Sequence, residues 1–386
     1  MDISKTYTLN LASRVLFGVG TAQQVGVEVR ALGVSHGLVV TDGGLVQTDV
    51  PGIVTASLDA AGVKWTLFGE VEPNPSILTV EKGLALYRAQ GCDGLIAVGG
   101  GSPMDAAKAI GFLASNGGSM RDFFAGKKVE RPLPPLAAIP TTCWTGSEVT
   151  QFAVITDTET HFKLGIGSPF NIPKVALVDP SLLIKLPSRM VASTGMDALC
   201  HAIESYTSLL AQPVSDAFSL HAIQMIGRHL RTAVANGNLT DLTGMAMASM
   251  LAGMAFNNTR TTLDHAMSHA VTGHAGVPHG IANAILAPHT MEFNLIGSPE
   301  KHGDIAAALG EDTDGLSIME AARTAVDAVQ ELADDVGIPH SLREVGVTEA
   351  HLEAMADDAM KSGGIVLNPR RPTRQDVLAL YKKALG

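Results

Sequence analysis

The sequence predicts a chain of two parts, an α/β domain followed by an all-helical domain. In the first half, short apolar runs such as GLVVTD and GLIAVGG alternate with segments of helical periodicity, which is typical of a parallel sheet covered by helices. From Ser188 onward the chain is rich in Ala, Leu and Met and keeps a helical period. The character changes between Pro180 and Pro187, so we expect domains of residues 1–186 and 187–386.

The composition indicates a globular protein with a small-molecule partner. At 386 residues the chain exceeds the usual size of one domain. Its 38 acidic and 27 basic residues give a net charge of −11, which argues against a nucleic acid or a membrane surface as partner. The N-terminal MDISKTYTLN has no apolar signal region, no run reaches about 18 uninterrupted apolar residues, and three cysteines follow no disulfide or zinc-ribbon spacing. We therefore expect a cytoplasmic protein.

A glycine-rich turn joins a predicted strand to a predicted helix. The strand GLIAVGG runs into Gly99, Gly100, Gly101 and Ser102, and a helix is expected over residues 105–115, with Ser102 as its candidate cap. Glycines at such a boundary let backbone N–H groups and the positive end of the helix approach a phosphate. A tight strand-to-helix connection without a ligand would have the same sequence, so the turn alone does not decide between them.

Two further features favour a bound dinucleotide. Asp42 ends the strand GLVVTD, where a carboxylate can accept hydrogen bonds from an adenosine ribose and would repel a 2′-phosphate. This favours NAD over NADP, although the same carboxylate could simply cap the following turn. The segment IPTTCWTGSEVT adds hydroxyl groups that can bind phosphate and ribose, at Thr141, Thr142, Thr145, Ser147 and Thr150.

Two separated segments carry candidate metal ligands. Asp197 and His201 are four residues apart in a predicted helix, so both side chains leave one face and can meet one cation. His265, His269 and His279 follow in LDHAMSHAVTGHAGVPHG. One carboxylate with imidazoles and no thiolate suits Fe(II), Zn(II) or Mn(II). An Asp/His pair at this spacing also occurs by chance. However, many polar side chains on otherwise apolar helices cost stability unless they are hydrogen-bonded or coordinate a metal ion. Their density here favours a metal site, at which the ion would polarise an oxygen atom.

Motifs along nearly the whole chain point the same way: FGVG, GGGSPMDAAKAI, IPTTCWTGSEVT, AVITD, TGMDALCHAIESY, AFNN, HAMSH, PHGIANAILAPH and NPR. Together they resemble the iron-dependent (group III) alcohol dehydrogenase family, which includes lactaldehyde reductase and butanol dehydrogenases. The resemblance implies an N-terminal dinucleotide-binding domain and an all-helical metal-binding domain, an architecture shared with dehydroquinate synthase. By position, it makes Asp197, His201, His265 and His279 the metal ligands.

The resemblance also implies the reaction, a hydride transfer between NAD(H) and a short alcohol or aldehyde, with Fe(II), or alternatively Zn(II), at the oxygen. It implies that Asp42 binds the ribose, that Gly99, Gly100, Gly101 and Ser102 bind the pyrophosphate, that Thr141, Thr142 and Thr145 line the phosphates and nicotinamide, and that Lys163 lies near a ribose. His269 would relay the alcohol proton, or would only pack beside the cofactor or a ligand histidine. Homo-oligomers are usual in the family.

The segment between AFNN and HAMSH departs from the small apolar residues that many family members carry. If Arg260 faces the pocket, it can pair with a carboxylate, sulfonate or phosphonate on the substrate; alternatively it pairs with Asp264 at i,i+4. The resemblance also implies a tight pocket for a short aldehyde. Cys143 and Trp144 stand where smaller residues are common in the family, and Phe152 and Phe256 match pocket-wall positions.

A lyase of dehydroquinate synthase-like type would share the architecture, NAD and metal, and is the alternative function. The HAMSH and PHG motifs argue against it. A metal hydrolase without a nucleotide would leave the glycine-rich turn and Asp42 unexplained.

Overall fold

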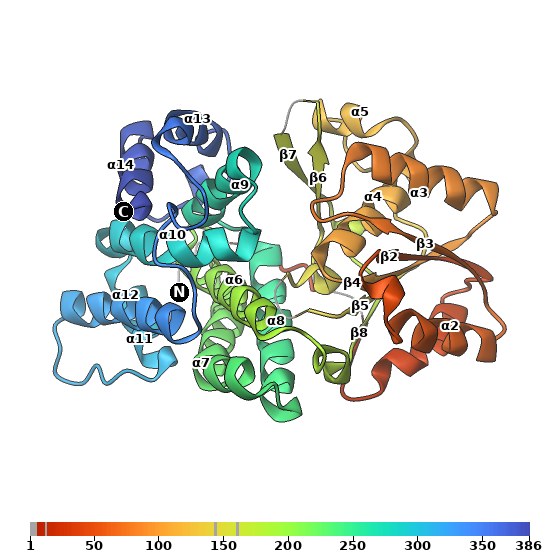
Figure 1. Ribbon diagram of the computed structural model, residues 1–386, viewed down its shortest axis with the longest axis horizontal. Coiled ribbons are helices and arrows are strands. Elements are labelled where there is room, and N and C mark those ends of the chain that lie inside the picture. The colour runs from red at the N-terminus through yellow and green to blue at the C-terminus, as the bar shows by residue number, and fades with distance from the viewer. Residues whose placement is uncertain (1–5, 12–13, 143–144, 160–161) are drawn as a thin grey trace. The chain divides into compact units, whose positions relative to one another are not determined.

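The computed structural model describes residues 6–11, 14–142, 145–159 and 162–386, so Cys143 and Trp144 lie outside the described residues. The chain forms two compact units (Figure 1). One is Asn10–Lys185, and the other is Leu186–Gly386 together with the N-terminal segment Met1–Leu9. The sequence analysis placed this N-terminal segment in the α/β domain. It groups with the helical unit, where the side-chain amide of Gln212 donates to the carbonyl of Thr8 at 3.1 Å.

A six-stranded parallel sheet organises the α/β unit, with the strand order β1-β8-β5-β4-β2-β3. The strands are β1 Arg14–Phe17, β2 His36–Asp42, β3 Lys64–Val71, β4 Gly94–Gly99, β5 Leu136–Pro140 and β8 Val175–Val178. The helices are α1 Val25–Ala31, α2 Val50–Ala60, α3 Ile77–Ala89, α4 Gly101–Asn116 and α5 Met120–Phe124. An antiparallel pair, β6 Phe152–Asp157 and β7 Phe162–Gly167, forms a second sheet.

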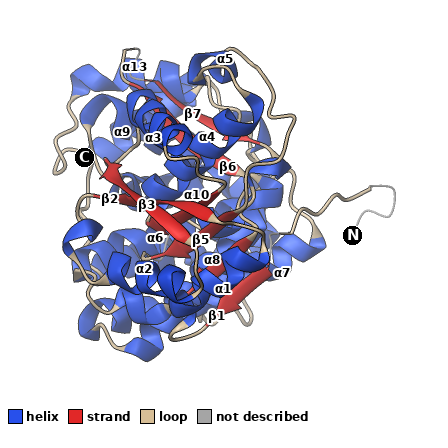
Figure 2. Cartoon of the chain, turned by 90° about the vertical axis from the view of Figure 1, so that its right-hand side faces the viewer, coloured by secondary structure: helices blue, strands red, loops and turns tan. Residues whose placement is uncertain are grey.

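Alternating side chains of the central strands enter two separate cores. Leu95 and Ala97 of β4 belong to the core with α3 and α4, whereas Ile96 and Val98 belong to the core with α1 and α2. Figure 2 shows these two helix pairs on opposite sides of the strands. Both faces of β4 are therefore buried, which explains why the sequence reads as a continuous apolar run.

The expected strands at GLVVTD and GLIAVGG are confirmed as β2 and β4. The expected start of the next helix is wrong. Helix α4 begins at Gly101, not at Asp105, and its cap is Gly100, so Ser102 lies inside the first turn and does not cap it. The glycine-rich turn is thus shorter than the sequence indicates, and it brings the helix terminus directly to the end of β4.

The helical unit consists mainly of α6 Ser188–Thr207, α7 Pro213–Asn236, α8 Leu239–Thr259, α9 Leu263–Ala275, α10 His279–Asn294, α11 Pro299–Leu309, α12 Ile318–Asp335, α13 Glu349–Ala359 and α14 Arg374–Leu385. These confirm the helices expected from the periodicity, with ends that move by a few residues. Helix α6 packs against α7, α8 and α10 (Figure 1) and is buried almost all round from Val191 to Thr207. Polar residues on α6 are therefore held inside the unit.

Helix α8 is long and apolar enough, by length and composition, to cross a membrane. Most of its apolar window is buried inside the structure, against α6 and α7. Its composition is accounted for by its place in the core of the helical unit.

Buried charges tie helix α4 to the segment that follows β5. Lys108 is fully buried, and its ammonium group donates to the Ser147 hydroxyl and to the Phe152 carbonyl, both at 2.8 Å. The Asp105 carboxylate accepts from the same Ser147 hydroxyl at 2.9 Å. Glu148 is buried beside this network, and burial raises the pKa of its carboxyl to about 7, although Lys108 acts in the opposite direction.

Glu148 should make the α/β unit less stable as the pH rises through the weakly acidic range. Between its ordinary pKa of 4.5 and its folded value of about 7, the folded protein holds a proton that the unfolded chain has lost. Stability therefore falls with rising pH in this window. In Glu148→Gln we expect the urea midpoint to decrease less between pH 5 and pH 7 than in the wild type. Glu130→Gln, at an exposed glutamate, is the control, and its urea midpoint should decrease between pH 5 and pH 7 as much as that of the wild type. If the urea midpoint of Glu148→Gln decreases as much as that of the wild type, the raised pKa of Glu148 is contradicted.

Candidate functional site

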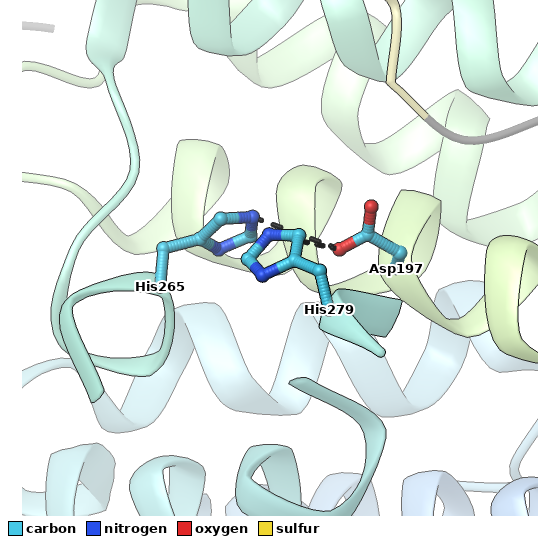
Figure 3. A group of neighbouring side chains, drawn as sticks. All are labelled: Asp197, His265 and His279. Carbon is cyan, nitrogen blue, oxygen red and sulfur yellow. Dashed lines mark ion pairs between the residues drawn. The ribbon is translucent and has the colours of Figure 1, made fainter. Parts of the chain in front are cut away.

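Three helices of the helical unit bring a carboxylate and imidazoles to one place. Asp197 and His201 lie one turn apart on α6 and are only 2% and 6% exposed, because α6 runs through the core. His265 lies in the first turn of α9 and is 3% exposed, and His279 is the first residue of α10. Figure 3 shows Asp197, His265 and His279 pointing toward one another.

The ligand atoms of Asp197, His265 and His279 all lie within 4.8 Å of one another. The Oδ1 atom of Asp197 is 3.7 Å from Nε2 of His265 and 3.9 Å from Nε2 of His279. The Nε2 atom of His201 lies 2.9 Å from Nε2 of His265, and its Nδ1 lies 3.9 Å from Oδ2 of Asp197. The structure therefore brings together all four residues that the resemblance makes metal ligands.

This donor set fits a divalent first-row metal ion. Bonds of about 2.1 Å allow two ligand atoms of one ion to lie at most about 4.2 Å apart. The two distances from Oδ1 of Asp197, 3.7 Å to His265 and 3.9 Å to His279, fall within that limit. The set contains one carboxylate and three imidazoles, which suits Fe(II) and Zn(II) alike. Burial adds to the fit, because the buried polar atoms of Asp197, His201 and His265 need a bonding partner.

Two further buried residues complete the centre. The Glu204 carboxylate, on α6, accepts a short hydrogen bond from Nδ1 of His265. The Asn283 amide, on α10, donates a short hydrogen bond to Oδ1 of Asp197, and its nitrogen lies 3.2 Å from Nε2 of His279. Asn283 therefore holds one ligand oxygen, and Glu204 holds the far side of one ligand imidazole.

The pKa values of the buried ionisable groups at the centre are strongly shifted. Burial raises the pKa of Asp197 to about 6, even though the charge of His265 opposes this change. Burial works against a charge on His265, but the Glu204 carboxylate outweighs it and raises the pKa of His265 to about 9. Burial also opposes the charge on Glu204, yet His265 and Thr262 together hold its pKa below the ordinary value. The buried carboxylates of Asp197 and Glu204 carry negative charge that favours a bound cation.

Aromatic rings cover the centre. The Phe256 ring stacks on His201 with a centroid distance of 4.4 Å and an interplanar angle of 16°. His269, one turn after His265 on α9, stacks on His279 at 4.9 Å. His269 thus lies beside a candidate ligand. Phe152, the other expected pocket-wall residue, lies on β6 in the α/β unit.

The expected pair of Arg260 with Asp264 is wrong. An i,i+4 pair needs a continuous helix, but α8 ends at Thr259 and α9 begins at Leu263. Arg260 between them has φ of 60° and ψ of 171°, a conformation that residues other than glycine rarely adopt. Its side chain is exposed, whereas Asp264 is buried and accepts from the Thr290 hydroxyl at 3.2 Å. In the described part of the chain, Arg260 forms no ion pair.

In the α/β unit, the glycine-rich turn and the hydroxyl-rich segment lie together. The Thr141 N–H donates to the carbonyl of Gly99 at 3.0 Å. A side chain on Gly101 would collide with Thr145, since its Cβ would come within 2.7 Å of a Thr145 methyl group. Gly99 has φ of 146° and its Cβ would meet Pro103. The two predicted segments thus share one loop cluster at the start of α4, together with Gly100, Ser102 and Thr142.

The other two predicted cofactor residues make contacts within the same unit. Asp42 ends β2, and its Oδ1 accepts from the N–H groups of Gly44 and Leu45, both at 2.9 Å, so it caps the following turn. Lys163 on β7 donates to the Asn74 side chain at 2.8 Å, and the Asn74 N–H donates to the Ser102 hydroxyl at 3.3 Å. Asn74 therefore connects Lys163 to the glycine-rich turn. Burial lowers the pKa of Lys163 to about 8.

Comparison with known proteins agrees with the geometry. The family model for iron-containing alcohol dehydrogenases matches residues 12–180, and the model for the C-terminal region of the Fe-containing alcohol dehydrogenase family matches residues 191–385. The 1,3-propanediol dehydrogenase of Klebsiella pneumoniae is 44% identical over 372 residues, which cover 95% of this chain and 96% of that protein. The chain belongs to the iron-containing alcohol dehydrogenase family.

Other members of the iron-containing alcohol dehydrogenase family are also similar over their full length. The crystal structure of a 1,3-propanediol oxidoreductase has a TM-score of 0.96 and 43% identity, covering 99% of this chain and 100% of that one. A sulfoacetaldehyde reductase of Bilophila wadsworthia is 36% identical, with 96% of each chain covered. The structure of a sulfoacetaldehyde reductase from Bifidobacterium kashiwanohense in complex with NAD⁺ has a TM-score of 0.89 and 29% identity, covering 98% of this chain and 99% of that one.

These relatives are dehydrogenases and reductases, and this member of the iron-containing alcohol dehydrogenase family is an alcohol/aldehyde oxidoreductase. Its fold, a parallel sheet domain with an all-helical domain, is that of the solved family members. The lyase alternative gains no support from them.

The sequence analysis gave no role to Glu204, Asn283 or Asn74. Signals for two of them were present in the spacing. Glu204 is three residues after His201, on the same stripe of α6, and Asn283 is four residues after His279 on α10. Asn74 carries no such signal, because it lies between β3 and α3 with φ of 58°.

Proposed function

We propose that the protein is an NAD-dependent oxidoreductase that interconverts a short alcohol and its aldehyde at an iron(II) ion held by Asp197, His201, His265 and His279. The convergence of these side chains from three helices is the observation that carries the proposal; three of them are buried, and His279 is partly buried. Zinc(II) suits the same donors. The family description and the NAD⁺ complex of a relative support the two cofactors.

The residues around the metal have separate tasks in this proposal. When bound, iron(II) supplies a Lewis acid that polarises the substrate oxygen, and NAD accepts or supplies the hydride. Asp197 supplies the negative charge among the ligands. Asn283 keeps Oδ1 of Asp197 in place.

His269 is proposed to relay the alcohol proton. Its ring is partly exposed and stacks on His279, beside the ligand atoms. An imidazole changes protonation near neutral pH, so it can take a proton on one ring nitrogen and pass it to water.

NAD is assigned to the α/β unit. The contact of Thr141 with Gly99 places hydroxyl groups beside a helix N-terminus, where a pyrophosphate is stabilised. Asp42 is proposed to bind the adenosine ribose in addition to capping its turn. The remaining proposed contacts are made by Gly99, Gly100, Gly101, Ser102, Thr141, Thr142, Thr145 and Lys163.

Arg260 is proposed to select aldehydes that carry an anionic group. Its loop is anchored on both sides, since the Thr259 hydroxyl bonds to Ser205 at 2.8 Å and Thr262 bonds to Glu204. Between these anchors Arg260 keeps an exposed guanidinium, one turn beyond Phe256, which stacks on His201. A guanidinium binds a sulfonate, carboxylate or phosphonate through paired hydrogen bonds. The similarity to sulfoacetaldehyde reductases supports this substrate class.

The proposed partners are NAD and a small alcohol or aldehyde. The net charge of −11 supports the prediction of no nucleic-acid or membrane partner. Three expectations stay predictions: the protein is cytoplasmic, it forms a homo-oligomer, and the side chains of Phe152 and Phe256 line the substrate pocket.

Removing one proposed ligand should abolish metal binding and turnover. After loading with Fe(II) in the absence of oxygen, we expect His265→Ala to contain at most about one tenth of the iron bound by the wild type. We also expect this variant to lose aldehyde-dependent NADH oxidation. Elemental analysis and the absorbance of NADH are the measurements. The control is His274→Ala on the same helix, where the exposed histidine bonds to Asp358 at 2.6 Å, and it should behave as wild type. Wild-type protein that binds iron and NADH but turns over no aldehyde would contradict the proposal.

Neutralising Arg260 should change specificity and leave the chemistry intact. We expect Arg260→Met to lower kcat/KM for sulfoacetaldehyde about 10- to 100-fold, the effect of losing a hydrogen bond to a charged group, and to change kcat/KM for propanal less than about twofold. Arg189→Met, at another exposed arginine of the helical unit, serves as the control. An equal loss for both aldehydes, or no loss for either, would contradict the role of Arg260.

A further inference from the structure

Glu204 is a buried carboxylate whose two oxygens have different partners. It is 5% exposed and lies on α6, facing the start of α9. Its Oε1 accepts from the N–H of Thr262 at 2.8 Å, from the Thr262 hydroxyl at 2.9 Å and from the N–H of His265 at 3.3 Å. Its Oε2 accepts the short hydrogen bond from Nδ1 of His265. Each oxygen is therefore engaged, one by backbone and hydroxyl donors and the other by an imidazole.

The Oε2 contact determines how His265 faces the metal centre. An imidazole that donates from Nδ1 has its lone pair on Nε2, and this atom lies 2.9 Å from Nε2 of His201 and 3.7 Å from Oδ1 of Asp197. A carboxylate behind a ligand histidine also fixes the plane of the ring and raises its basicity. Without Glu204, the ring could rotate or present the other nitrogen.

The Oε1 contacts hold the helix that carries His265. Thr262 is the cap residue of α9, yet its own side chain makes no capping hydrogen bond to the helix. Glu204 accepts N–H groups there in its place, and a negative charge at this end is favourable for the helix dipole. One side chain of α6 thus sets both the position of α9 and the orientation of its first histidine.

Glu204 could instead be a metal ligand, because Glu204, Asp264 and His265 also bring ligand atoms within 4.8 Å of one another. The hydrogen bonds argue against this. Both Glu204 oxygens already accept from protein donors, and a cation there would have to displace the Nδ1 proton of His265. The arrangement is that of an acceptor behind a ligand.

We propose that Glu204 is a positioning residue of the metal centre, which holds His265 so that Nε2, and not Nδ1, binds the ion. The inference rests on the proposed function, in which His265 is a ligand. Asp197, His201 and Glu204 then form a single unit on α6, in which two residues bind the ion and the third orients a ligand that comes from another helix.

The test compares metal affinities of the full-length apoprotein by competition with a chromophoric chelator, using Co(II) alone. We expect Glu204→Gln to bind Co(II) about 10- to 100-fold more weakly than the wild type and to shift the visible cobalt spectrum. The amide lacks the negative charge and has one acceptor oxygen, so it cannot accept both from Thr262 and from Nδ1 of His265. Thr262→Ala removes a hydroxyl donor to Oε1 and leaves the Oε2 contact, so it should bind Co(II) within about twofold of the wild type.

The outcomes separate this inference from the proposed function. If Co(II) affinity in His265→Ala equals that of the wild type, the ligand assignment fails. If His265→Ala loses affinity but Glu204→Gln does not, or if Thr262→Ala loses as much as Glu204→Gln, the positioning role fails. Should Glu204→Gln not fold, nitrogen-15 NMR of the zinc-loaded wild type decides the matter. A proton retained on Nδ1 of His265 supports the role, and zinc on Nδ1 overturns it.

Discussion

The structure of the helical unit depends on the burial of charged and polar side chains on helix α6. Asp197, His201 and Glu204 lie inside a core of apolar helices, where an unpaired charge would cost several kcal/mol. Partners from α9 and α10, His265 and Asn283, offset part of this cost by hydrogen bonds. A divalent cation would offset more of it. The positions of α6, α9 and α10 relative to one another are therefore tied to the chemistry of the centre.

In the α/β unit, buried charged side chains also hold the segments of the candidate site in place. The glycine-rich turn places the end of β4 directly against the start of α4, and Lys108 anchors the neighbouring segment through Ser147. Buried charges support the loops there, as they support the ligand helices in the other unit. Family membership and the relatives' names identify the chemistry as oxidation of an alcohol or reduction of an aldehyde.

Patterns with a regular period could be predicted from the sequence, and single tertiary contacts could not. The apolar runs of β2 and β4 and the periodicity of α6 through α14 were enough to locate these elements, and the spacing of Asp197 and His201 placed both on one face. The pair of Arg260 with Asp264 was wrong because counting four residues assumes an unbroken helix, and the positive φ of Arg260 leaves no mark in the sequence. The spacing places Glu204 on the same stripe of α6 as His201, but the group that Glu204 contacts depends on where α9 packs.

The central claim is that one carboxylate and three imidazoles of the helical unit hold a single metal ion. X-ray absorption of the Fe(II)-loaded protein, with His265→Ala beside the wild type, tests it most directly. The account predicts a shell of nitrogen and oxygen atoms at about 2.1 Å with the multiple scattering of about three imidazoles in the wild type, and about one imidazole fewer, or no bound iron, in the variant. A shell without imidazole scattering, or one unchanged in His265→Ala, would contradict the account.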